Sequence, residues 1–526
     1  MIQGSRVLVI DFGSQYSHLI CRRCREVGVY SELRSFDITI SEIKEFSPNG
    51  VILSGGPASV YAADAPHLSK DVWETLNIFP VLGICYGMQE MVHAAGGSVA
   101  KGVKREFGFA SVSRATSNSV FDDLFGLITD TIDVWMSHGD KVTKLPKGFE
   151  VMALSENTEM CVIAEHEKHW FGLQFHPEVT HTPKGTEIIR NFCKIAGCNF
   201  TWMMKEFVSK QIDDLQNKLS DPVIQVVGAV SGGVDSTVAA AVLHKAIGPR
   251  FHPFMIDTGL LRKDETLEVK QRLEKHIPGL NLTVVDASNE FFKALVNVKE
   301  PEEKRKIIGR LFVESFERTV KDILQVDISN CFLLQGTLYP DVIESLSHKG
   351  PSHTIKTHHN VGGLPDRMEM KVLEPLRLLF KDEVRSLGRE LNIPVESVNR
   401  HPFPGPGLAI RIIGEVTQER VDTLRQADSI FIDEIRKAGE YDKIGQAFAV
   451  LVPDVKTVGV MGDGRTYESL CCLRAVQTSD FMTASWYKMP YDLLERVSTR
   501  IINEVSGINR VCYDISSKPP ATIEWE

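Results

Sequence analysis

The sequence lacks the cysteine patterns of a disulfide-rich or zinc-binding protein. Its 526 residues contain ten cysteines, with only two close pairs, Cys21/Cys24 and Cys471/Cys472. Scattered thiols of this kind form no disulfide framework, and neither pair has the second half that a zinc site needs. We therefore expect neither structural disulfides nor a zinc centre.

Long apolar runs and an excess of basic residues are also missing. No window approaches the ~20 apolar residues of a membrane span, and residues 2–13 predict a short strand and turn rather than a signal peptide. The 59 Lys and Arg residues are outnumbered by 69 Asp and Glu, and the net charge of −10 argues against a surface for duplex nucleic acid. We expect a cytoplasmic protein with no membrane and no nucleic-acid partner, although local donors can still bind small anions.

What is present is an ordinary globular composition, 43% hydrophobic and 24% charged, in a chain too long for one core. Two stretches alternate short apolar runs with helical segments, which predicts two doubly wound α/β domains. After a proline-rich stretch at 401–407 the pattern changes to that of a smaller α+β domain, and residues 206–220 predict a linker helix. We expect domains at 6–199, 200–393 and 394–526. The predicted strands are 7–10, 50–54, 80–84 and 171–175, then 223–230, 251–256, 282–285 and 331–334, then 448–452, 457–461 and 511–515.

The turn at 228–237, with the sequence Gly-Ala-Val-Ser-Gly-Gly-Val-Asp-Ser-Thr, predicts a phosphate-binding loop between a buried strand and a helix. Glycines let backbone N–H groups approach a phosphate, and the helix N-terminus favours anions. The lysine of a Walker loop is absent. Backbone and hydroxyl groups would hold the phosphates, and Asp235 would be available to a metal ion.

A second turn predicts a nucleophilic thiol. The stretch 81–87, Val-Leu-Gly-Ile-Cys-Tyr-Gly, is an apolar strand that runs into Gly-x-Cys-x-Gly, the thiol counterpart of the serine nucleophile elbow. Cys85 would stand above the sheet, near the N–H groups of the following helix. Further along, His176 and Glu178 are two residues apart and point the same way on an extended chain. His176 would take the proton of Cys85, and Glu178 would orient the imidazole.

This combination resembles the class I glutamine amidotransferases over residues 6–199, through Ser-Gly-Gly-Pro at 54–57, Gly-Ile-Cys-Tyr-Gly-Met-Gln at 83–89 and His-Pro-Glu at 176–178. The resemblance implies that Cys85 attacks the side-chain amide of glutamine and releases ammonia. It implies oxyanion donors at the N–H groups of Gly56 and Tyr86. Gln89 and the segment 137–140 would surround the glutamine, while His138 is as consistent with a structural role.

The loop at 231–236 resembles that of the N-type ATP pyrophosphatases, with Thr237 where serine is common. The family adenylates a carbonyl oxygen and releases pyrophosphate with Mg²⁺, so ATP and Mg²⁺ are implied. Lys381 would close over the phosphates or be a solvated helix charge. The implied ATP contacts are Ser231, Gly232, Gly233, Val234, Asp235, Ser236, Thr237 and Lys381, with Asp235 as the metal ligand.

Longer blocks resemble the family of glutamine-hydrolysing GMP synthetases, which convert XMP to GMP. They lie at 301–309, 357–360, 400–411, 462–465 and 517–526. The resemblance implies a homodimer built by the C-terminal region and five XMP contacts, which are Arg305, Gln446, Asp463, Lys518 and Glu524. Two rivals stay open: an amidating ATP pyrophosphatase that makes NAD or asparagine, and an inactive scaffold or regulatory protein.

Overall fold

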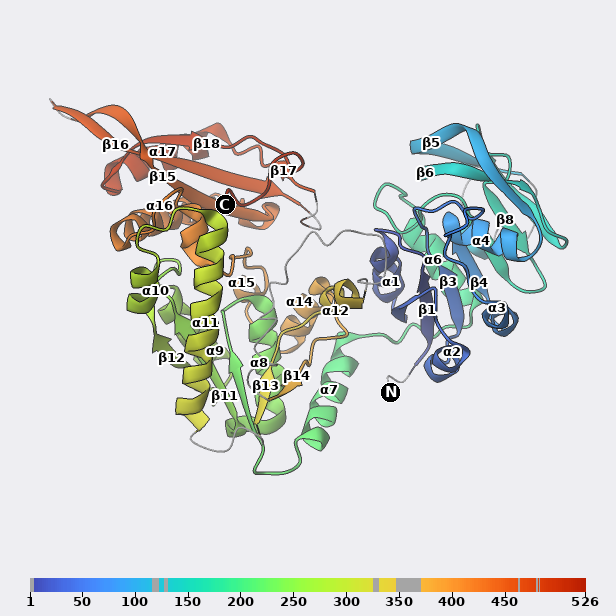
Figure 1. Ribbon diagram of the computed structural model, residues 1–526, viewed down its shortest axis with the longest axis horizontal. Coiled ribbons are helices and arrows are strands. Elements are labelled where there is room, and N and C mark those ends of the chain that lie inside the picture. Colours follow the sequence, from blue (N-terminus) through green and yellow to red (C-terminus); the bar gives the residue numbers. More distant parts are fainter. Residues whose placement is uncertain are drawn as a thin grey trace. The chain divides into compact units, whose positions relative to one another are not determined.

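The computed structural model describes residues 4–115, 123–126, 131–324, 331–346, 370–461, 464–478, 481 and 483–526. Asp463 and the block at 357–360 lie outside these residues. The chain divides into two compact units, Met1–Phe207 with Pro340–Thr354 and Val208–Tyr339 with Ile355–Glu526. Helix α7 (Met204–Lys218), close to the predicted linker helix, begins at the end of the first unit (Figure 1).

The first unit is built on a mixed sheet, nine-stranded in the described residues, with the order β2-β1-β3-β4-β9-β8-β7-β5-β6. The five strands from β2 to β9 run parallel, and the rest add antiparallel pairs. The strands are β1 (Arg6–Asp11), β2 (Tyr30–Ser35), β3 (Gly50–Leu53), β4 (Val81–Ile84), β5 (Ser98–Arg114), β6 (Thr131–Lys144), β7 (Phe149–Ser155), β8 (Val162–Glu165) and β9 (Trp170–Leu173). The helices are α1 (Ser17–Glu26), α2 (Ile40–Phe46), α3 (Lys70–Leu76), α4 (Tyr86–Ala94) and α6 (Gly185–Ile195).

Helices cover the parallel part of this sheet, which is why strands β3, β4 and β9 are buried along their whole length. Helices α1 and α6 pack together. A separate apolar cluster joins α2, α3 and α4 to the sheet through residues such as Ile43, Val72 and Met91. The four strands predicted for this region are therefore present as β1, β3, β4 and β9.

The second unit begins with a five-stranded parallel sheet of order β12-β11-β10-β13-β14. Its chain order reverses between β10 and β13, and α/β sheets bind ligands at the carboxyl ends of strands beside such a reversal. The strands are β10 (Gln225–Ala229), β11 (Phe251–Asp257), β12 (Thr283–Asp286), β13 (Cys331–Leu334) and β14 (Lys371–Leu373). The helices are α8 (Val234–Ile247), α9 (Glu265–His276), α10 (Ser288–Ala294), α11 (Pro301–Leu324), α14 (Lys381–Glu390) and α15 (Val395–Val398), and α12 (Tyr339–Leu346) spans the division between the units.

A smaller α+β part completes the second unit. Strands β15 (Gln446–Met461) and β16 (Gly464–Gln477) form a long antiparallel pair, β17 (Ser485–Trp486) adds antiparallel to β16, and β18 (Ile508–Tyr513) adds parallel to it. The sequence predicted two strands at 448–452 and 457–461. They are one strand, because a bulge between Val452 and Lys456 absorbs the extra residues without ending the pairing.

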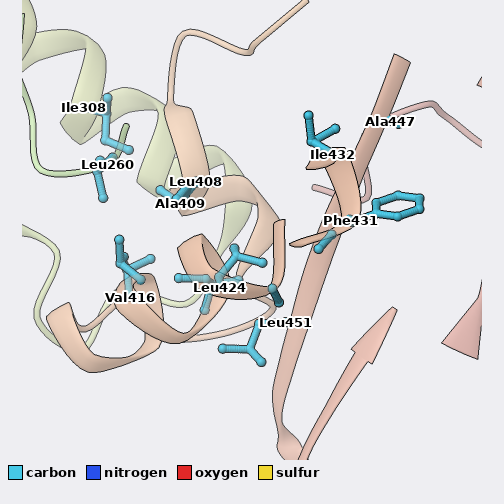
Figure 2. Close-up of a cluster of buried hydrophobic side chains, with 14 of the residues drawn as sticks. Leu260, Ile308, Leu408, Ala409, Val416, Leu424, Phe431, Ile432, Ala447 and Leu451 are labelled. Carbon is cyan, nitrogen blue, oxygen red and sulfur yellow. The ribbon is translucent and has the colours of Figure 1, made fainter. Parts of the chain in front are cut away.

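One apolar core runs from the parallel sheet into this smaller part. The 3₁₀ helix η4 (Gly407–Arg411) follows the proline-rich stretch and buries Leu408 and Ala409 against α16 (Gln418–Lys437) and β15, as Figure 2 shows. Helix α17 (Tyr491–Glu504) packs on α16. The shared core explains why residues 394–526 belong to the same compact unit as the five-stranded sheet.

The expected fold class is confirmed: two α/β sheets with helices, followed by a smaller α+β part. The limits of the three predicted domains stay a prediction. Among the described residues, no helix is both long and apolar enough to cross a membrane.

Candidate functional site

Cys85 occupies the sharp turn between β4 and α4, as the elbow pattern predicts. Its backbone has φ 51° and ψ −102°, a conformation that residues with a side chain rarely adopt. The Cys85 N–H donates to the carbonyl of Leu173 on β9 at 2.6 Å, which ties the turn to the sheet. Strain of this kind persists where the surrounding structure fixes it, and it is common at catalytic residues.

The glycines on either side of Cys85 are required by space. A Cβ atom at Gly83 would lie 2.6 Å from the backbone nitrogen of Met88. A Cβ atom at Gly87 would overlap the backbone of Leu53 on β3. Strand β4 can therefore turn into α4 this tightly only because both positions carry no side chain.

His176 and Glu178 form the buried pair that their spacing predicts. His176 Nδ1 lies 2.7 Å from Glu178 Oε1, and the Glu178 side chain is fully buried. The side chain of Cys85 lies near enough to the imidazole to influence its pKa. Burial by itself lowers the pKa of His176, but the charge of Glu178, the nearby Cys85 and the hydrogen bond to Glu178 outweigh it and hold that pKa well above its ordinary value. The site therefore favours an imidazolium beside the sulfur.

The two predicted oxyanion donors lie on neighbouring elements. Tyr86 is the first residue of α4, and the first N–H groups of a helix have no acceptor within it. Gly56 packs against the same residue, since a Cβ atom there would lie 3.2 Å from Tyr86 Cγ. This close approach lets the backbone of the 54–57 segment reach the turn that carries Cys85.

Gln89 lies in the first turns of α4 and is buried. Its Nε2 donates to the carbonyl of Asp140 at 3.1 Å and to Gln174 Oε1 at 3.3 Å. Gln174 is fully buried, and its Nε2 lies 3.5 Å from the sulfur of Cys85. The sequence analysis assigned no role to Gln174, although it precedes His176 and Glu178 at the same two-residue spacing.

His138 belongs to a buried polar cluster beside this site. Its Nε2 lies 3.0 Å from Glu106 Oε2, and its Nδ1 lies 3.0 Å from the carbonyl of Asp140. Burial lowers the pKa of His138 despite the charge of Glu106. The carbonyl of Asp140 also accepts a hydrogen bond from Gln89, so the cluster helps to hold Gln89 in place. This arrangement is consistent with a structural role for His138.

The phosphate loop follows β10, at the reversal of the second sheet, and leads into α8 with Gly233 as its N-cap. Its hydroxyl groups are arranged around the loop: the Ser231 N–H donates to Ser236 Oγ at 3.2 Å, and Ser236 Oγ donates to the Gly233 carbonyl at 3.1 Å. Gly232 has φ +74° and lies close to Val269. The loop thus presents the N-terminus of α8 and two hydroxyls at the edge where a nucleotide is expected.

Lys381 begins α14, and its Nζ is ion-paired with Asp235 Oδ2. The structure therefore places this lysine beside the phosphate loop, and a role toward the phosphates stays a prediction. Asp235 Oδ1 is buried and has no hydrogen-bond partner among the described residues. Arg400, from the proline-rich region, donates to the carbonyl of Gly232 at 3.3 Å.

Three of the predicted XMP contacts, Arg305, Gln446 and Glu524, lie at or contact the last three residues of the chain. Gln446 Nε2 donates to Glu524 Oε1 at 2.7 Å. Arg305 Nη2 donates to the backbone oxygen of Glu526 at 2.5 Å. Lys518 lies beside β17 and donates to the carbonyl of Phe481 at 2.7 Å. The fifth predicted contact, Asp463, lies outside the described residues.

Three buried cations that the sequence analysis missed hold the same segment. Arg411 binds both oxygens of Glu524, at 3.1 and 2.8 Å, and its guanidinium lies 4.2 Å from the ring centre of Phe448. Lys304 Nζ lies 2.5 Å from Glu526 Oε2. Arg474 donates to the carbonyls of residues 522 and 523, both at 2.8 Å. For Arg474, a charged residue within an otherwise apolar strand was the signal by which sequence analysis could have found it.

Comparison with known proteins gives one family for the whole length. Residues 8–196 match the family model of class-I glutamine amidotransferases, and residues 433–525 match that of the GMP synthase C-terminal domain. The glutamine-hydrolysing GMP synthase of Aquifex aeolicus is 55% identical over 526 residues, which is 100% of each chain. Those of Eremothecium gossypii and Saccharomyces cerevisiae are 56% and 54% identical, over 99% of this chain and 98% of theirs. Matches of this length include the thiol site, the phosphate loop and the C-terminal segment together, so the chain belongs to the family of glutamine-hydrolysing GMP synthases.

Proposed function

We propose that the chain makes GMP from XMP in two half-reactions, each on residues of one unit. Glutamine supplies ammonia, and ATP activates XMP, with glutamate, AMP and pyrophosphate as the other products. The observation that carries the assignment of residues is the buried His176–Glu178 hydrogen bond, with Cys85 close enough to the imidazole to raise its pKa. A thiol nucleophile, its base and the group orienting that base require such an arrangement.

The first half-reaction is glutamine hydrolysis at Cys85. The sulfur attacks the side-chain amide carbon of glutamine, and the N–H groups of Gly56 and Tyr86 stabilise the oxyanion. His176 gives its proton to the departing nitrogen, which leaves as ammonia, while the glutamyl group stays on Cys85 as a thioester. His176 then takes a proton from water, which cleaves the thioester and frees glutamate. Glu178 keeps the imidazole in place.

The second half-reaction adenylates the carbonyl oxygen at C2 of XMP, because that oxygen is a poor leaving group until it is part of AMP. The loop residues Ser231, Gly232, Gly233, Val234, Asp235, Ser236 and Thr237 hold the phosphates of ATP, together with Lys381. Ammonia displaces AMP and leaves GMP.

The residues of this loop fit a magnesium ion. Mg²⁺ in phosphate sites is usually held by one or two carboxylates and the substrate phosphates. Asp235 supplies such a carboxylate, since Lys381 pairs with its Oδ2 while Oδ1 is buried and unpartnered among the described residues. When bound, the ion would neutralise charge on the leaving pyrophosphate.

XMP would bind at the C-terminal segment. Arg305 and Lys518 suit its phosphate, while Gln446, Asp463 and Glu524 suit the base or ribose. Gln446 binds Glu524 and Arg305 binds the backbone of Glu526, so both contact the C-terminal segment, which supports this assignment.

The domain limits 6–199, 200–393 and 394–526 and a C-terminal homodimer belong to the same proposal. Exposed apolar side chains on the β15–β16 hairpin, among them Val458, Val460 and Tyr467, offer the dimer a contact surface. We also propose a cytoplasmic location, where reducing conditions suit the thiol of Cys85.

The test is to supply purified protein with XMP, ATP, Mg²⁺ and glutamine and to separate the nucleotides. GMP should form, and aspartate or the NAD precursor offered in place of XMP should not be amidated. Amidation of either, with no GMP, would assign the chain to another branch of the ATP pyrophosphatases.

A further inference from the structure

Gln174 connects the nucleophile to the glutamine-binding wall. It follows β9 and lies two residues before His176, with its side chain fully buried. One end of its amide lies 3.5 Å from the sulfur of Cys85, and the other lies 3.3 Å from Gln89 Nε2. The effect of this amide on the sulfur depends on whether its NH₂ group or its oxygen faces Sγ.

The neighbouring groups fix the direction of this amide. The carbonyl of Asp140 can only accept a hydrogen bond, so the atom of Gln89 that faces it at 3.1 Å must be the NH₂ group. The same NH₂ group faces Gln174, whose facing atom must therefore be its oxygen. The NH₂ group of Gln174 is left to face the sulfur.

We infer that Gln174 is a catalytic residue of glutamine hydrolysis, whose Nε2–H donates to the sulfur of Cys85 and stabilises it as a thiolate. The inference rests on the proposed role of Cys85. A hydrogen bond to an ionised acceptor is stronger than one to a neutral acceptor, so this donor favours the thiolate over the thiol. It also favours the thiolate over the thioester, in which the sulfur carries no charge.

The donor would act twice in each turnover. Before the attack on the glutamine amide, it increases the fraction of Cys85 that is present as the thiolate. It acts again when water cleaves the thioester and the sulfur departs with the electron pair of its bond to carbon. His176 supplies and removes the protons in both steps, and Gln174 gives up none.

The other neighbours of the sulfur make this donor necessary. The carbonyl of Ser137 lies 3.8 Å from Sγ and can accept from a thiol but repels a thiolate. His176 offers a positive charge, with Glu178 behind it, and the buried pair His138 and Glu106 lies farther out. Gln174 therefore offsets the Ser137 carbonyl with a neutral donor.

The experiment is alkylation of the whole protein by iodoacetamide, followed by mass analysis of the peptides that contain Cys85 and Cys512. Cys512 is the exposed cysteine of the chain, whereas the other nine are buried, so it gives a reference rate within each sample. Gln174→Met replaces the donor with an apolar side chain of similar length. Gln174→Glu keeps the shape and replaces the donor with a carboxylate.

At pH 7 we expect Cys85 in both variants to react about tenfold more slowly than in the wild type, the effect of one lost hydrogen bond to a charged group. At pH 9.5, where a thiol ionises without help, the rates should approach each other. Cys512 should react unchanged. Asn191→Leu is the matched control, because it removes another buried amide, which donates to the Leu124 carbonyl at 3.1 Å, in the same unit. It should leave Cys85 alkylation unchanged.

Cys85 rates within twofold of the wild type in both variants at pH 7 would overturn the inference. So would an equal slowing at both pH values, which indicates a displaced sulfur. GMP synthesis from added ammonia verifies that each variant is folded. If Gln174→Met does not fold, the shape-conserving Gln174→Glu decides alone. A wild-type protein that hydrolyses no glutamine would instead refute the proposed function.

Discussion

At the scale of single residues, we expect each half-reaction to depend on a group that the other does not use. Cys85 and Asp235 lie in different compact units, on the turns that follow β4 and β10. Each turn ends a buried parallel strand and starts a helix. Removing one side chain should therefore separate the two chemistries.

Replacing Cys85 by alanine removes the sulfur that we propose attacks glutamine. We expect glutamine-dependent GMP synthesis to fall at least about a thousandfold, the order found when a catalytic nucleophile is lost. Synthesis from added ammonium chloride should stay within twofold of the wild type, because the phosphate loop is untouched. Steady-state rates with each nitrogen source provide the measurement, and Cys512→Ala is the control. Loss of both activities would show that the sites are not separable.

Replacing Asp235 by alanine removes the carboxylate proposed to hold the metal ion and leaves Lys381 without its partner. Adenylation should fall by about two orders of magnitude, as when one charge-stabilising group is lost from an active site. The fall should be the same with glutamine and with ammonia. Pyrophosphate release measures it, and Glu274→Ala, which alters an exposed carboxylate on α9, is the control. Normal turnover in the Asp235 variant would refute the role given to this residue.

Functional roles could be predicted from the sequence for residues whose type and spacing indicate a specific chemistry. His176 and Glu178 were predicted as a pair from their spacing and lie 2.7 Å apart. Gln174 has the same spacing but an amide has many uses, so its type alone suggests no role. Lys304 and Glu526 are 222 residues apart in the chain, and no local pattern predicts such a contact.

At the scale of elements, the turn from β4 into α4 is the most constrained part of the thiol site. We expect Gly87→Ala to lower the free energy of unfolding by about 2–4 kcal/mol, since a new methyl group would overlap the backbone of Leu53. Glutaminase activity should be lost, while ammonia-dependent synthesis remains. Chemical denaturation and the two assays measure these effects.

Gly309→Ala is the matched control, because a Cβ atom at this position of α11 meets open space. It should be neutral or slightly stabilising. A Gly87 variant with the stability and glutaminase rate of the wild type would show that the tight turn is not required.

The proline-rich region contains a histidine that makes folding sensitive to acid. The ring of His401 stacks on Tyr441 at 3.9 Å, and burial lowers its pKa from 6.5 to about 4. Between pH 6.5 and pH 4 the unfolded chain binds a proton at His401 that the folded chain does not bind. The contribution of neutral His401 to the free energy of unfolding is therefore fully present above pH 6.5 and is lost as the pH falls toward 4. The loss should reach about 3 kcal/mol, at 1.4 kcal/mol per pH unit.

Urea denaturation of wild type and His401→Gln between pH 8 and pH 4 measures this effect. The stability difference between the two proteins should be constant above pH 7 and then shift by that amount as the pH falls. Because carboxylates titrate equally in both, the difference isolates His401. A difference that does not change with pH would contradict the assignment.

The strands of the parallel sheets were predictable because buried strands appear as short apolar runs. The β15–β16 hairpin was not, because a bulge breaks its alternation while the pairing continues past it. The 3₁₀ helix η4 was also missed, since the proline-rich sequence around it predicts only a turn.

At the scale of the whole molecule, residues of the sulfur site all belong to one compact unit and those of the nucleotide site to the other. Free ammonia in neutral water is mostly protonated and no longer a nucleophile. We propose that joining the two chemistries in one chain serves to limit that loss. A change of pattern near residue 200 was visible in the sequence, and the domain limits drawn from it stay a prediction. The shared core of the second unit was not predicted, since it joins elements from distant parts of the chain.

The most direct measurement follows the nitrogen atom. Protein given XMP, ATP, Mg²⁺ and glutamine labelled with ¹⁵N at the side-chain amide should release GMP that carries the label. GMP, glutamate and pyrophosphate should appear in equal amounts. Glutamate that accumulates without labelled GMP, or pyrophosphate formed at a rate independent of GMP, would contradict the account.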